Sequence, residues 1–135
     1  MRILVTGGYG LIGHNVVKRL KDLRHSTYIV DTKTNYGIIP QSEIDYLMAE
    51  RAAKIDYHLH YNTDIVNTGP IDYVVQTTGP EVLVHMASFP RQKVVNANPQ
   101  WGSRVMSEGL LNLCELSKNN NVRKFVYISS SMVYG

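Results

Sequence analysis

Short apolar runs alternate with longer segments of helical periodicity along the whole chain. The apolar runs predict five β-strands, at 2–6, 27–31, 56–61, 82–86 and 125–128. Between them, apolar residues recur every three or four positions and predict four amphipathic helices, at 11–23, 43–54, 70–77 and 98–118. The segments 32–42 and 87–97 are expected to be loops. Strands that alternate with helices in this order predict an α/β fold with a doubly wound parallel sheet.

The last predicted helix is the longest. Asn98 and Pro99 suit its start, because asparagine is a frequent N-cap and proline fits the first helical turn. Its spacing predicts a buried stripe formed by Met106, Leu110, Leu113, Cys114 and Ser117. Cys114 is the only cysteine, so the chain forms no internal disulfide, and a single buried thiol fits a reducing compartment.

A glycine-rich turn joins the first predicted strand to the first predicted helix. Gly7 can adopt the backbone angles of a tight turn, Gly10 leaves room for a phosphate, and Gly13 lets the helix pack closely. The helix start then offers free N–H groups and the positive end of its dipole. This pattern predicts a site for the pyrophosphate of a dinucleotide. Gly7 and Gly10 are three positions apart, whereas the more common dinucleotide pattern has two.

Asp31 ends the second predicted strand, 18 residues beyond Gly13. A carboxylate at this point accepts hydrogen bonds from the adenosine ribose and repels a 2′-phosphate, so it favours NAD over NADP. Lys33 could serve a 2′-phosphate, which leaves NADP as the second choice. In the alternative interpretation Asp31 is an ordinary loop acid and the glycines only make a turn. The order and separation of the two signals favour the cofactor site.

Other polar residues follow the later strands, at the edge of the sheet where ligands bind in open α/β folds. Asp64 could accept a hydrogen bond from the adenine amino group, or it could be a turn or cap residue. The serine triplet 129–131 could act on a substrate, or it could simply end a strand. His85 lies in an apolar strand and is predicted to be a core histidine. The sequence shows no cluster of His, Cys, Asp and Glu with metal-ligand spacing.

Composition narrows the class of protein. At 135 residues, the chain is expected to form one domain, residues 1–135, with a substantial core. The net charge of +3 comes from scattered basic residues without a long run, which argues against nucleic-acid binding. The absence of a signal peptide and of an apolar span of membrane length predicts a cytoplasmic protein.

Taken together, the motifs resemble the N-terminal part of an extended short-chain dehydrogenase/reductase of the nucleotide-sugar epimerase/dehydratase family. The UDP-hexose 4-epimerases have the most similar pattern. The matching segments follow family order and spacing, and they are 6–13, Asp31, 64–65, 84–88, 112–115 and 124–135. The resemblance implies a Rossmann fold, NAD as the cofactor and a nucleotide sugar as the substrate of the full-length enzyme.

The resemblance also implies roles for individual residues. The glycines would hold the pyrophosphate beside the following backbone, Asp31 the adenosine ribose, and Asp64 with Ile65 the adenine. Ala87 and Ser88 would line the nicotinamide ribose. The implied cofactor-binding residues are Gly7, Gly10, Leu11, Ile12, Gly13, Asp31, Asp64, Ile65, Ala87 and Ser88. Ser130, with Ser131 beside it, would hydrogen-bond the substrate hydroxyl, because a serine can both donate and accept.

One family feature is missing from the 135 residues. The family's catalytic base is the tyrosine of a Tyr-x-x-x-Lys motif, and no tyrosine here has a lysine four positions later. The first hypothesis is therefore a chain that ends before the substrate-binding part and has no turnover by itself. The second is a complete, non-catalytic dinucleotide-binding module, such as a homo-oligomer that covers its sheet edge. The third is a scaffold or redox-sensing protein that uses the fold without turnover.

Overall fold

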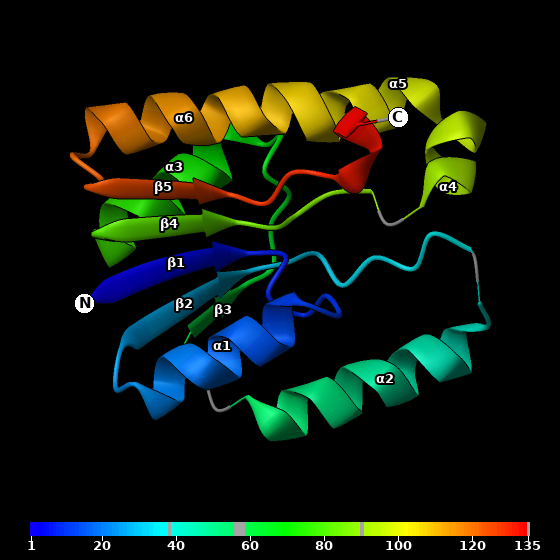
Figure 1. Ribbon diagram of the computed structural model, residues 1–135, viewed down its shortest axis with the longest axis horizontal. Helices are drawn as coiled ribbons and strands as arrows, with labels where there is room; N and C mark the ends of the chain where they lie inside the picture. The colour runs from blue at the N-terminus through cyan, green and yellow to red at the C-terminus, as the bar shows by residue number, and fades with distance from the viewer. Residues whose placement is uncertain (38, 56–58, 90, 135) are drawn as a thin grey trace.

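Five parallel strands form a single sheet in the order β3-β2-β1-β4-β5 (Figure 1). The computed structural model describes residues 1–37, 39–55, 59–89 and 91–134. The strands are β1 (Arg2–Thr6), β2 (Ser26–Val30), β3 (Leu59–Tyr61), β4 (Val82–His85) and β5 (Lys124–Tyr127). The predicted five-stranded, doubly wound parallel sheet is confirmed. Of the predicted third strand, residues 56–58 lie outside the described residues.

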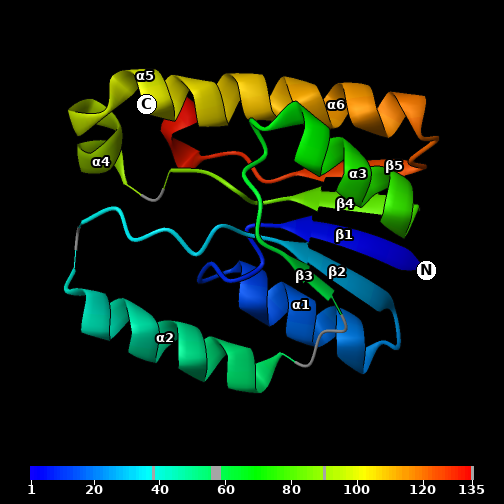
Figure 2. The same ribbon diagram turned by 180° about the vertical axis from the view of Figure 1, so that it is seen from behind.

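Helices cover both faces of the sheet (Figures 1 and 2). One face carries α1 (Gly13–Asp22) and α2 (Gln41–Lys54), and the other carries α3 (Thr68–Thr78) and α6 (Gly109–Asn119). Successive strand residues point to opposite faces, so Ile3 and Val5 of β1 join the core beneath α1 while Leu4 joins the core beneath α3. Two apolar clusters therefore sandwich the sheet.

The direction of winding reverses next to β1. The chain passes from β1 to β2 and β3 on one side, then returns to place β4 and β5 on the other side. In open α/β sheets this reversal separates the loops that leave neighbouring strands, and ligands bind in the resulting crevice at the carboxyl ends. The fold thus places the turn after β1 and the loop after β4 at the switch point.

The predicted loop 87–97 is wrong in its second half, because α4 (Gln92–Ala97) forms there. This helix has six residues, too few to give a periodic signal. It forms because Val94 is buried in the core, with Val95 packed against the same cluster. Smaller differences occur at helix starts. The second helix begins at Gln41, and Pro70 is the third residue of α3.

The predicted helix 98–118 consists of α5 (Pro99–Ser103), a π-helical segment (Arg104–Glu108) and α6. Its buried stripe differs from the prediction, since Cys114 is exposed and Met106 is 38% exposed. The residues that face the core are Gly102, Val105, Gly109, Leu113 and Ser117.

Close approach of the long helix to Ile65 explains why its buried stripe differs from the prediction. A methyl group on Gly109 would lie 2.6 Å from Ile65 side-chain carbons, so glycine allows the helix to approach the sheet. The prediction was right for Leu113 and Ser117. It missed Gly102 and Gly109 because it looked mainly for apolar side chains. With Cys114 exposed, its burial no longer supports a reducing compartment.

Among the described residues, no helix has both the length and the apolar character needed to cross a membrane.

Candidate functional site

A cavity of about 440 Å³ opens at the switch point. It is bounded by the glycine turn, the segment after β2, one side of α2 and the loops after β3 and β4. The residues proposed from sequence that line it are Gly7, Gly10, Leu11, Asp31, Asp64, Ile65, Ala87 and Ser88. Residues separated by up to 81 positions in the sequence thus meet in one cavity.

The glycine turn is tightly packed at two positions. Gly7 has a φ of +74°, a left-handed conformation that side chains disfavour, and an added methyl group would lie 2.7 Å from the Ala87 nitrogen. A methyl group on Gly13 would overlap the Gly7 carbonyl oxygen. The Gly7 amide donates to the Val30 carbonyl at 2.8 Å, which joins the turn to the end of β2. Glycine is therefore required at both positions by contacts with backbone atoms.

The start of α1 presents backbone donors. Within the described residues, the amides of Leu11, Ile12 and Gly13 have no backbone acceptor, while the Gly10 amide donates to the Gly7 carbonyl at 3.0 Å. The first turn of α1 contains no acidic residue. Unpaired amides at the positive end of a helix dipole favour an anion, and a pyrophosphate satisfies them.

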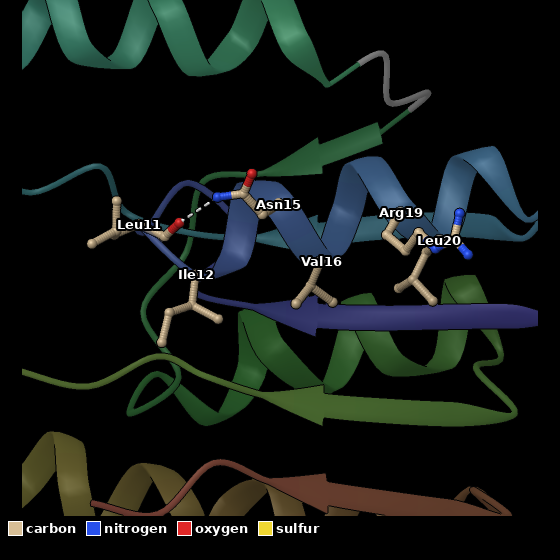
Figure 3. Close-up of a pocket in the computed structure, with 6 residues that line it drawn as sticks. All are labelled: Leu11, Ile12, Asn15, Val16, Arg19 and Leu20. Carbon is tan, nitrogen blue, oxygen red and sulfur yellow. Dashed lines mark hydrogen bonds between the residues drawn. The ribbon is translucent and has the colours of Figure 1, made fainter.

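The side chain of Ile12 lies outside the cofactor cavity. It is 60% exposed and lies with Val16 and Leu20 along one flank of α1, where they line a separate apolar groove of about 490 Å³ (Figure 3). Leu11 borders both the groove and the cavity. Ile12 can therefore contribute its backbone, and not its side chain, to a ligand in the cavity.

Asp31 lies immediately after β2 with its carboxylate half buried. Its Oδ2 atom accepts from the Tyr9 amide at 2.8 Å, and its Oδ1 atom accepts from the Lys33 amide at 2.8 Å. Burial raises the pKa of Asp31, while the Lys33 amide and the nearby His60, Lys33 and Arg51 side chains oppose that rise. Each carboxylate oxygen has a further lone pair, so the group can also accept from ribose hydroxyls.

Tyr9 has a side-chain role that was not predicted from the sequence. Its side chain is only 1% exposed, although it occupies the middle of the glycine turn. The ring packs edge-on against His60, with centroids 5.0 Å apart, and the Lys33 ammonium lies 3.9 Å from its centroid. The Tyr9 carbonyl accepts from Arg51 Nη1 at 2.6 Å. The available signal was a single aromatic residue among the small residues of the turn.

Asp64 and Ile65 form the opposite side of the cavity. The Asp64 Oδ1 atom accepts from the Val66 amide at 3.2 Å, so this residue holds the turn before α3 as well as lining the cavity. Ile65 is buried, and its carbonyl accepts from Asn112 Nδ2 at 3.1 Å. Ile65 is therefore held by contacts with the long helix.

Ala87 and Ser88 follow β4 and line the cavity beside the glycine turn. The Ala87 amide donates to the Thr6 hydroxyl at 3.3 Å, which holds the start of this loop against β1. Ser130 and Ser131 follow β5, and Ser131 is the first residue of a 3₁₀ helix (Ser131–Tyr134). Ser130 is not among the residues that line the cavity, although both serines lie beyond the carboxyl end of a neighbouring strand. In the described part of the chain, no cluster of three or more His, Cys, Asp and Glu could hold a metal ion.

His85 is a core histidine, as predicted. It is 2% exposed, its Nδ1 atom lies 2.7 Å from the Thr6 hydroxyl, and its ring stacks on Tyr127. Burial lowers the pKa of His85 to about 4. The neutral ring therefore links β1, β4 and β5 behind the cavity.

Acid is expected to destabilise the fold through His85. In the unfolded chain this histidine binds a proton below its usual pKa of 6.5, whereas in the folded chain it does so only below about 4. The free energy of unfolding should therefore fall by about 1.4 kcal/mol per pH unit between those values as pH decreases. Urea unfolding at several pH values measures this slope. His85→Gln should reduce it, whereas the control His25→Gln should leave it unchanged; equal slopes in all three proteins would contradict the assignment.

A family model supports this geometry over nearly the whole chain. The model described as "NAD dependent epimerase/dehydratase family" matches residues 3–135. The chain belongs to this family. The match begins within β1 and includes the glycine turn, Asp31 and the loops that line the cavity.

Individual proteins resemble the chain at low sequence identity. UDP-glucose 4-epimerase from Dictyostelium discoideum is 28% identical over 134 residues, which are 99% of this chain and 37% of that protein. The X-ray structure of Pal from Bacillus thuringiensis aligns with a TM-score of 0.82 at 27% identity, over 98% of this chain and 40% of that one. The UDP-glucose 4-epimerase of Stenotrophomonas maltophila, solved with NAD and formylated UDP-arabinopyranose, has a TM-score of 0.82 at 23% identity, over 100% of this chain and 38% of that one. The chain therefore spans about two fifths of the length of these relatives.

Proposed function

We propose that residues 1–135 form the NAD-binding domain of a nucleotide-sugar epimerase/dehydratase. The observation that supports this most strongly is the meeting of two complementary groups in one cavity. The free amides at the start of α1 suit a pyrophosphate, and the Asp31 carboxylate suits a ribose. A dinucleotide carries both of these chemical groups.

The other proposed residues in and around the cavity complete the binding mode. Gly7, Gly10 and Gly13 let the backbone approach the pyrophosphate, and Asp64 with Ile65 flanks the adenine. Ala87 and Ser88 lie toward the nicotinamide ribose. The bound cofactor supplies the hydride acceptor for oxidation of a sugar carbon, and this chain contributes binding and orientation.

Ser130 is proposed to hydrogen-bond the hydroxyl of the sugar that is oxidised, with Ser131 beside it. The position beyond β5 supports this role, since substrates of such sheets approach the carboxyl ends of the strands. A nucleotide sugar as substrate is supported by the family, and by the UDP-sugar named with the Stenotrophomonas structure.

The 135-residue chain is expected to bind NAD without catalysing turnover, because it contains no Tyr-x-x-x-Lys motif. Calorimetric titration with NAD and NADP tests the binding, and tighter binding of NADP would contradict the ribose role of Asp31. Absorbance at the NADH maximum in the presence of a UDP-sugar tests turnover. NADH production that survives Ser130→Ala would contradict both the expected inactivity and the role of the serine.

A second candidate is a non-catalytic dinucleotide-binding module. The coding sequence downstream of Gly135 separates the two. An open frame that encodes Tyr-x-x-x-Lys supports the enzyme, and an immediate stop codon supports the module. Self-association and a cytoplasmic location remain predictions in both cases.

A further inference from the structure

The glycine turn is held by a side chain from α2. Arg51, in the last turn of that helix, donates from Nη1 to the Tyr9 carbonyl at 2.6 Å, across 42 positions of sequence. On the other side of the same residue, the Tyr9 amide donates to Asp31 Oδ2 at 2.8 Å. The peptide groups before and after Tyr9 are therefore both held by side chains from outside the turn.

We propose that Arg51 is a positioning residue for the dinucleotide, acting through the Tyr9 carbonyl. This inference rests on the proposed NAD-binding function. By holding that carbonyl, Arg51 keeps the peptide that leads into Gly10 in the orientation that exposes the Leu11 and Ile12 amides to an anion. Helix α2 thus takes part in cofactor binding although the sequence assigned it no site residue.

The chemistry of the carbonyl explains why it needs a partner. A carbonyl oxygen carries partial negative charge, so an unheld carbonyl in this turn could rotate toward the pyrophosphate and repel it. A hydrogen bond from a guanidinium is charge-assisted and stronger than a bond between neutral groups. Arg51 also lies close enough to Asp31 to favour its ionised form. The same side chain therefore supports both halves of the proposed site.

The Tyr9 ring makes the anchor rigid. The ring is buried, packs against His60 and lies beneath the Lys33 ammonium. The His60 Nε2 atom in turn lies 2.9 Å from the Asp31 carbonyl. Because the ring cannot move freely, the Tyr9 backbone is presented to Arg51 in a single orientation, and the cost of ordering the turn is met before a ligand arrives.

The hydrogen bond from Arg51 to the Tyr9 carbonyl also links α2 to the ligand. None of the 14 residues of α2 is fully buried. The helix lies beside α1 (Figures 1 and 2), and half-buried residues such as Met48 and Ala52 pack against the apolar cluster on this face of the sheet. A helix with so little buried surface opens readily. If the docked helix strengthens NAD binding, then NAD must stabilise the docked helix by the same factor.

Calorimetric titration of the 135-residue chain with NAD tests the proposal. Arg51→Met should weaken binding about tenfold, the range expected when one charge-assisted hydrogen bond is lost. Arg51→Lys, which keeps a charge and a donor, should recover most of the affinity. The matched control is Lys54→Met, an exposed lysine one turn further along the same helix, which should change affinity less than about twofold.

Hydrogen exchange distinguishes a positioning role of Arg51 in NAD binding from a purely structural role. NAD should slow exchange of the α2 amides in the unmodified chain and in Lys54→Met, and should not do so in Arg51→Met. If Arg51→Met does not fold, as judged by circular dichroism, Arg51→Gln replaces it with the same expectation. Unchanged affinity and unchanged NAD-induced protection of α2 in these variants would overturn the inference. Failure of the unmodified chain to bind NAD would instead overturn the proposed function.

Discussion

Replacing Gly13 with alanine is expected to weaken NAD binding about 100-fold or more. The added methyl group would overlap the Gly7 carbonyl oxygen, so α1 or the turn must shift. A shift there moves the Leu11 and Ile12 amides, which are the proposed pyrophosphate donors. A 100-fold loss corresponds to about 2.7 kcal/mol of binding free energy. Forced overpacking of this kind also destabilises folded proteins by about 1–3 kcal/mol, so a lower melting temperature is expected.

The chain offers a matched control at Gly69. This glycine lies near the start of α3, and a methyl group there would have no neighbouring atom within 4 Å. Gly69→Ala should leave NAD affinity unchanged and stabilise the fold slightly, because alanine favours helix over glycine. Calorimetry and thermal unfolding of both variants make the comparison. Normal NAD affinity in Gly13→Ala would show that the turn does not hold the pyrophosphate.

Replacing Asp31 with asparagine is expected to weaken NAD binding about 30-fold while NADP binding stays the same or improves. Asparagine has one acceptor oxygen and two N–H donors, so it cannot accept from both the Tyr9 and Lys33 amides and also from ribose hydroxyls. Hydrogen bonds to a charged partner contribute about 1.5–3 kcal/mol, which accounts for a change of this size. Loss of the negative charge removes the repulsion of a 2′-phosphate, and Lys33 remains nearby.

The contribution of Asp31 to NAD affinity should also depend on pH. Burial raises the pKa of the Asp31 carboxyl, so this group becomes protonated at a higher pH than an exposed aspartate. NAD affinity should therefore decrease as the pH is lowered and the carboxylate is lost. Calorimetric titrations at pH values between 7 and 4.5 follow this decline. In Asp31→Asn the part of the pH dependence due to this residue should disappear.

Asp22→Asn serves as the control for the Asp31 experiments. Asp22 is exposed on α1, where its carboxylate lies 3.9 Å from Lys18, and surface pairs of this kind contribute little. The control should therefore match the unmodified chain in NAD affinity and cofactor preference. If Asp31→Asn also matches the unmodified chain, Asp31 is a loop acid that only orders the turn.

Local patterns in the sequence predicted most of the fold. Strand β1, for example, contains the continuous apolar run 3–5 because both faces of the strand are buried, and such a run is recognisable without knowledge of its neighbours. The glycine turn and Asp31 were predicted for the same reason, since each depends on the conformation of a few consecutive residues and on their position after a strand. The family resemblance combined these local signals in the right order, and the family match agrees with it.

Contacts between distant residues were decided only by the tertiary structure. The inner face of the long helix depends on Gly109 meeting Ile65, and a rule that selects apolar residues could not find a glycine. Likewise, Tyr9 and Arg51 are 42 positions apart, and nothing near either residue in the sequence indicates the other. Their contact depends on where α2 docks, and docking depends on packing that no local pattern encodes. The sequence by itself therefore determined which elements form and where a dinucleotide is expected, whereas the tertiary structure decided which distant side chains hold that site in place.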